Sequence, residues 1–189
     1  MNAYVINLDS REDRLKLFKE NDFPFPVERF PAITASCGEN GCTYSHLAVL
    51  KNVFPFVVFE DDAVLIEKWK FVEKSLTQLP SNWDGLWLGA TLRQPLVKYS
   101  LNLFQLKKAW CLHAVIYNSP RMIEYILENH NTPSGINLDT FYCHEVFKRF
   151  NCFLTYPLVA VQSSGLSDIS KKYQDHFTEI LTKYNHYVK

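Results

Sequence analysis

The chain has 189 residues, of which 47% are hydrophobic and 15% aromatic, and this is enough apolar material for one domain with its own core. Basic and acidic residues number 20 each, so the formal net charge is zero, which argues against nucleic acid as a partner. No apolar run approaches the roughly 20 residues of a membrane span, and the first residues do not resemble a signal peptide. Five cysteines without CxxC spacing favour a reduced, cytoplasmic setting of bacterial, phage or viral type.

Strand and helix patterns alternate along the chain. We expect strands over residues 3–8, 28–33, 56–59, 86–89, 112–117 and within 153–162, and helices over 11–20, 43–52, 65–79, 119–129, 138–150 and 171–187. Residues 90–110 are compatible with either a hairpin or a mobile loop, and 130–135 with a loop. The alternation predicts a single α/β domain with a mostly parallel central sheet flanked by helices.

The most informative segment is the apolar run Phe56–Phe59, which ends in Glu60, Asp61 and Asp62. Such a run is typical of a buried strand, and three adjacent carboxylates repel one another unless a cation holds them. Hard oxygen ligands suit Mg²⁺, Mn²⁺ or Ca²⁺, and ligands of α/β sheets bind at the carboxyl ends of strands. The segment therefore predicts a metal site. The alternative is a solvated loop, or the capped start of a following helix.

A second polar group surrounds the expected helix 43–52. Ser45 and His46 follow Gly41 at its start, where free N–H groups suit a phosphate, although a structural role for His46 is the alternative. Cys37, Cys42 and His46 are chemically able to bind zinc. No fourth ligand follows at a familiar spacing, so we favour the cysteines as small apolar fillers around a glycine turn.

Taken in order, five segments of the chain resemble glycosyltransferase family 25, which includes lipopolysaccharide and collagen hydroxylysine galactosyltransferases. They are VINLDSREDR (5–14), GCTYSHL (41–47), VFEDDA (58–63), HAVIY (113–117), and YPLVAVQ (156–162) with SDI (167–169). The resemblance implies a GT-A-like fold, a UDP-sugar donor, a divalent metal (Mn²⁺ or Mg²⁺) and inversion at the anomeric carbon. It also implies a nucleotide-binding part at about 1–90, an acceptor-binding and catalytic part at about 91–170, and a C-terminal helix at about 171–187. The chain is short for the family and shows no secretory signal.

The resemblance also implies roles for the acidic segment. We expect Asp62 to contact the metal directly and Glu60 to contact metal-bound water or the ribose. Asp61 is expected to bond the ribose or the backbone, because strand alternation turns it away from the other two. Asp168 would complete the metal shell or hold the C-terminal loop, and Gln162 would line the pocket.

The donor and the acceptor need further groups. Asn7 is placed to meet the base, while Arg11 and Arg14 share a helix face from which they would hold the uracil end or a phosphate. Their alternative is a solvated helix start. An inverting transfer needs a general base, for which Asp139 and Glu145 are the candidates. We prefer Asp139, whose alternative role is a helix N-cap.

Together, these residues and the resemblance predict a metal-dependent hexosyltransferase that moves galactose or glucose from a UDP-sugar to a glycan, a lipopolysaccharide or a hydroxylated protein. Tryptophan side chains and a lid formed by 91–108 are candidates for the acceptor side. The alternatives are a nucleotidyl- or phosphoryl-transfer enzyme and a non-catalytic nucleotide-sugar-binding protein. The first turn, Asp9-Ser10-Arg11, lacks the glycine-rich loop of a nucleotidyltransferase. A weaker hypothesis is membrane-surface contact through the basic, aromatic tail 171–189.

Overall fold

The computed structural model describes residues 2–51, 55–130 and 137–188. Its centre is an eight-stranded sheet of order β2-β1-β3-β10-β5-β11-β8-β7. The strands of this sheet are β1 (Asn2–Asn7), β2 (Glu28–Pro31), β3 (Phe56–Glu60), β5 (Gly85–Trp87), β7 (Val97–Ser100), β8 (Leu103–Gln105), β10 (Ala114–Tyr117) and β11 (Cys152–Thr155). Shorter ribbons pair β4 (Ala63–Leu65) with β12 (Ala160–Gln162), β6 (Thr91–Leu92) with β9 (Ala109–Trp110), and β13 (Gly165–Leu166) with β14 (Tyr173–Gln174).

The sheet is mixed, which corrects the prediction of a mostly parallel one. The pairs β1–β2, β1–β3 and β5–β11 are parallel, whereas β3–β10, β5–β10, β8–β11 and β7–β8 are antiparallel. Neighbouring parallel strands need a long crossover, usually a helix. Between β5 and β10 the chain instead forms β6 to β9, so it re-enters the sheet beside β3 in the opposite direction. Strands from residues before and after about 90 share this one sheet, in which β10 lies between β3 and β5.

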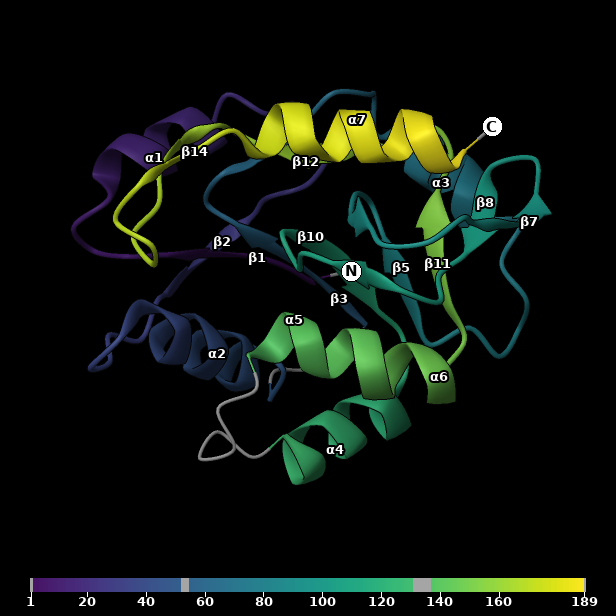
Figure 1. Cartoon of the computed structure of the whole chain (residues 1–189), viewed down its shortest axis with the longest axis horizontal. Coiled ribbons are helices and arrows are strands. Elements are labelled where there is room, and N and C mark those ends of the chain that lie inside the picture. The colour runs from purple at the N-terminus through teal and green to yellow at the C-terminus, as the bar shows by residue number, and fades with distance from the viewer. Residues whose placement is uncertain (1, 52–54, 131–136, 189) are drawn as a thin grey trace.

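Helices cover both faces of the sheet (Figure 1). In the view shown, α1, α3 and α7 lie on one side, and α2, α4, α5 and α6 lie on the other. Their bounds are α1 Glu12–Phe18, α2 Gly38–Val49, α3 Lys70–Leu76, α4 Pro120–Asn129, α5 Leu138–Phe141, a π-helical turn Tyr142–Val146, α6 Phe147–Arg149 and α7 His176–Tyr187. The alternation of β3 explains the two layers, because Phe56 and Val58 belong to one core cluster while Val57 and Phe59 belong to the other.

Several local predictions are confirmed. The run that ends in the acidic segment is the buried strand β3. The helix predicted from residue 119 is α4, with Pro120 in its first turn and the Ser119 hydroxyl accepting a hydrogen bond from the Met122 N–H. Residues 97–105 form the β7–β8 hairpin, one of the two alternatives left open for 90–110. The expected loop 130–135 lies almost wholly outside the described residues.

Other boundaries differ from the prediction. The acidic segment is followed by β4, and α3 begins only at Lys70, so neither Asp61 nor Asp62 caps a helix. The second helix begins at Gly38 and not at Thr43. Residues 38–41 are helical, although their sequence is typical of a turn. The C-terminal helix begins at His176 and buries Ile180. Within the described part of the chain, no helix combines the length and the apolar character needed to cross a bilayer.

Candidate functional site

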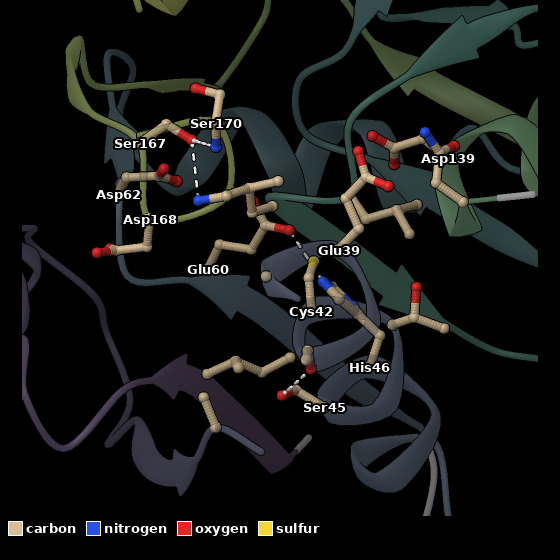
Figure 2. Close-up of a pocket in the computed structure, with 18 of the residues that line it drawn as sticks. Glu39, Cys42, Ser45, His46, Glu60, Asp62, Asp139, Ser167, Asp168 and Ser170 are labelled. Carbon is tan, nitrogen blue, oxygen red and sulfur yellow. Dashed lines mark hydrogen bonds and ion pairs between the residues drawn. The ribbon is translucent and has the colours of Figure 1, made fainter. Parts of the chain in front are cut away.

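A cleft of about 930 Å³ opens beside the carboxyl end of β3 (Figure 2). Its walls come from the acidic segment, the first turns of α2, the start of α5, and the chain that follows β12. Nine of the predicted site residues line it: Arg14, Ser45, His46, Glu60, Asp61, Asp62, Asp139, Gln162 and Asp168. The fold thus gathers in one place residues that the sequence spreads over more than 150 positions.

The side chains of the acidic segment point in two different directions. Asp61 accepts hydrogen bonds from Asn7 Nδ2 (2.7 Å) and Arg14 (3.2 Å), so it faces β1 and α1. Glu60 and Asp62 instead face the same amide nitrogen of Gln162, at 3.1 and 3.4 Å. This agrees with strand alternation, which places Glu60 and Asp62 on one side.

The β4–β12 ribbon positions Gln162. Its antiparallel register places Gln162 opposite Ala63, the residue after Asp62. The backbone N–H of Ser163 also donates to the carbonyl oxygen of Asp62 (2.8 Å). A strand from late in the chain therefore fixes the conformation of the acidic turn.

Burial dominates the electrostatics of these carboxylates. It raises the pKa of Asp62 to about 7, and the negative charge of Glu60 adds to the effect while Arg14 opposes it. Burial also raises the pKa of Asp61. For Glu60, burial is outweighed by the hydrogen bond and the charge of His46, and the pKa is lowered. An ionised Asp62 beside an ionised Glu60 is costly without a cation.

The donor set fits a hard divalent ion. One carboxylate oxygen of Glu60 and one of Asp62 face the Gln162 side-chain nitrogen, and an ion bound by both oxygens would take the place of that nitrogen. Mg²⁺ and Mn²⁺ prefer such oxygen ligands. The carbonyl oxygen of the Gln162 side chain is buried and has no hydrogen-bond partner among the described residues, so it offers a further oxygen. Asp168 lines the cleft but forms an ion pair with Arg11.

The side chain of Asp139 does not cap its helix. The cap of its helix is Asn137, whose side chain accepts from the N–H of Thr140 (2.9 Å), so Asp139 is not the N-cap. Asp139 is half-buried in the cleft wall. Burial raises its pKa to about 6, and the charge of Glu60 contributes in the same direction. Cys111 also lines the cleft and lies next to Asp139. Its backbone φ of 81° is a strained value for a residue other than glycine.

The structure does not bring Glu145 into the cleft, which corrects its candidacy as a general base. Glu145 lies in the π-helical turn and pairs with Arg149 at 3.0 Å. Its other neighbour is the hydroxyl of Tyr125. Of the two predicted bases, only Asp139 lies with the acidic segment.

Ser45 and His46 lie inside α2 and not at its start, which corrects the idea that they present free N–H groups to a phosphate. The Ser45 hydroxyl donates to Gly41 and accepts from the N–H of Ile33, so it joins the helix to the preceding loop. His46 places its Nε2 2.9 Å from Glu60 Oε1. The imidazole of His46 therefore helps to position Glu60.

Asn7 and Arg11 are not among the residues that line the cleft, but each contacts a residue that does. Asn7 is buried, donates to Asp61 and accepts from the Nε of Arg29 (2.9 Å), an arginine that the sequence did not single out. Arg11 holds Asp168 and Asp13. These contacts position cleft residues.

The cleft is also lined by Trp110, one of the tryptophans considered for the acceptor side, and by Arg93, which the sequence did not single out. The guanidinium of Arg93 stacks on Trp110 with 3.5 Å between its Cζ and the ring centroid, and both residues line the cleft. Trp110 is 41% exposed, whereas Trp69 and Trp87 are buried in the core. The segment 90–110 has no clear periodicity, so no sequence signal pointed to this pair in particular.

No family model matches the chain, and no curated protein matches it. Among solved structures, the chain is similar to A197 from STIV, with 14% sequence identity and a TM-score of 0.48. The similarity covers 93% of this chain and 96% of that one. The function therefore has to be inferred from the residues of the cleft.

Proposed function

We propose that the protein is a metal-dependent glycosyltransferase that takes a hexose, galactose or glucose, from a UDP-sugar and transfers it with inversion to a hydroxyl group. The acceptor would be a glycan, a lipopolysaccharide or a hydroxylated protein. One observation carries the proposal: Glu60 and Asp62 converge at the end of β3 in the same cleft that Asp139 lines. The sequence segments that resemble glycosyltransferase family 25 support it.

Glu60 and Asp62 would hold Mn²⁺ or Mg²⁺, and Asp168 lines the same cleft. When bound, the ion neutralises the diphosphate leaving group as a Lewis acid. Arg14 adds a fixed positive charge, since its guanidinium lies 3.2 Å from Asp61 and 3.4 Å from Asp62. Asn7 donates to Asp61 and is itself held by Arg29, so these contacts would position the acidic turn before the donor binds.

Asp139 would remove the proton from the acceptor hydroxyl. A general base works best when its pKa lies near the working pH, and burial raises the pKa of Asp139 to about 6. The deprotonated hydroxyl would attack the anomeric carbon on the face opposite the diphosphate, and this single displacement inverts the configuration.

Calorimetric titration of UDP, with and without Mn²⁺, tests the proposal. The wild type should bind UDP in the presence of Mn²⁺, and Asp62→Asn should weaken this binding at least about tenfold, because it removes one ionic ligand. Glu145→Gln is the matched control, since it also replaces a carboxylate by an amide but lies outside the cleft. Failure of UDP to bind, or binding that is indifferent to both the metal and Asp62, would overturn the proposal.

Incubation with UDP-sugars then separates the alternatives. A glycosyltransferase releases UDP and leaves the sugar on an acceptor or on water. A nucleotidyl-transfer enzyme would instead cleave between the phosphates, and a binding protein would leave the donor intact.

A further inference from the structure

A second group of metal-ligating atoms lies at the base of the cleft. The Cys42 sulfur, a ring nitrogen of His46 and a carboxylate oxygen of Glu60 all lie within 4.8 Å of one another. Cys42 and His46 are four residues apart on α2 and so share a helix face, and Glu60 faces them from the end of β3. Figure 2 shows the sulfur beside the imidazole, with the Glu60 carboxylate directed at the same point.

The hydrogen bonding of His46 is incomplete. The side chain is only 2% exposed, and its Nδ1 is buried with no hydrogen-bond partner in the described part of the chain. Its Nε2 lies 2.9 Å from Glu60. Buried polar atoms are nearly always paired, so an orphan nitrogen here needs an explanation.

The three donors differ in kind from the all-oxygen set around Asp62. Thiolate, imidazole and carboxylate together are the ligands of Zn²⁺ and similar cations, whereas Mg²⁺ and Mn²⁺ prefer oxygen. Tetrahedral zinc places its ligand atoms roughly 3.3 to 3.7 Å apart, so side-chain movements on the order of 1 Å would close the site. All three residues line the cleft.

We propose that Cys42, His46 and Glu60 bind Zn²⁺ or a chemically similar divalent cation through sulfur, nitrogen and oxygen. The Cys42 thiol releases its proton to solvent as the sulfur binds the metal, and no oxidant or reductant is involved. Glu60 belongs both to this site and to the oxygen set of the proposed donor site. Zinc at this position therefore competes with the Mn²⁺-dependent binding of UDP.

Titration of the full-length protein with Co²⁺ tests the site without reference to any activity. We expect a thiolate-to-cobalt charge-transfer band in the near ultraviolet, together with the intense visible bands of tetrahedral cobalt. Cys42→Ser should abolish the charge-transfer band, and His46→Gln should weaken Co²⁺ binding at least about tenfold. Cys37→Ser is the matched control and should keep the band, because Cys37 is exposed and lies outside the three-residue group.

Absence of the band in the wild type, or its persistence in Cys42→Ser, would overturn the proposal. Alkylation of the wild type provides a measurement that needs no variant. Under conditions that label Cys42 in the metal-free protein, zinc should protect it from iodoacetamide, as identified by peptide mass. Equal labelling of Cys42 with and without zinc under those conditions would contradict the site.

The zinc site and the donor site can fail separately. Asp62→Asn should keep the cobalt band while losing Mn²⁺-dependent UDP binding. Cys42→Ser should keep UDP binding while losing its inhibition by Zn²⁺. If UDP does not bind at all, the proposed function fails, but the cobalt titration still decides the zinc site.

Discussion

The side-chain amide of Gln162 donates to Glu60 across 3.1 Å, although the two residues lie 102 positions apart in the sequence. The same nitrogen lies 3.4 Å from Asp62. The neutral amide of Gln162 thus lies within hydrogen-bonding distance of both the Glu60 and the Asp62 carboxylates. Its position follows from the register of the β4–β12 ribbon, in which Gln162 lies opposite Ala63.

Replacement of Gln162 by leucine tests this relationship. Gln162→Leu keeps the approximate volume but removes a donor from two partly buried carboxylates, so we expect unfolding in urea to show a loss of about 1–3 kcal/mol. Added Mn²⁺ should recover part of that loss if the carboxylates hold the ion. Gln94→Leu, outside the cleft, serves as the control. A loss that is equal in both variants would show that Gln162 has no special role.

The rate of donor hydrolysis reports on Asp139 even when the acceptor is unknown, because water can take the place of the acceptor. A base must be deprotonated, and the pKa of Asp139 is raised to about 6, so the rate should increase with pH through about 6 and then level off. Asp139→Asn should lower the rate by about 10²- to 10⁴-fold and remove this limb of the profile. Glu145→Gln should leave both unchanged. An unaltered profile in Asp139→Asn would exclude Asp139 as the base.

Gly89 permits the close approach of two backbone segments beside the cleft. A Cβ atom there would lie 1.9 Å from the carbonyl oxygen of Ala160 and 2.7 Å from Nε2 of His113. The N–H groups of Val159 and Ala160 both donate to Leu88 in this region, so the backbone cannot retreat without breaking those bonds. We expect Gly89→Ala to cost more than about 3 kcal/mol of stability or to prevent folding.

Gly165→Ala is the matched control for Gly89→Ala. A Cβ atom at Gly165 meets nothing within 4 Å. Thermal denaturation should therefore show little change for Gly165→Ala, within about 0.5 kcal/mol. Equal melting temperatures for the two variants would mean that the approach of Gly89 to Ala160 is not needed for the fold.

The sequence predicts the local parts of the site better than their assembly. The strand before Glu60 and the shared side of Glu60 and Asp62 follow from apolar patterning and from the period of a strand. The direction of β10 could not be predicted, because it depends on how residues 88–113 return to the sheet. The same holds for Gln162, which reaches the acidic segment through strand register, and for Arg29, which through strand register reaches Asn7, the partner of Asp61.

Helix periodicity explains why only one of the two candidate bases lines the cleft. Asp139 and Glu145 both lie within the expected helix 138–150, yet they are six residues apart. At about 100° per residue this separation turns the second side chain roughly 240° around the axis, away from the first. Periodicity alone therefore places only one of them in a cleft, and the π-helical turn at 142–146 does not restore a shared face.

His113 gives the stability of the protein a specific dependence on pH. Burial lowers its pKa from 6.5 to about 4, so the folded state prefers the neutral ring while the unfolded chain takes up a proton near pH 6.5. Stability is therefore full above about pH 6.5 and falls as the pH drops towards 4, by ~2–3 kcal/mol. Asp62 and Asp139 titrate in the same range, so the quantity to measure is the difference between the wild type and His113→Gln, in which those contributions cancel. Urea unfolding near pH 7.5 and near pH 4.5 should show that the wild type loses ~2–3 kcal/mol more than the variant, and parallel losses would show that His113 does not remain neutral in the fold.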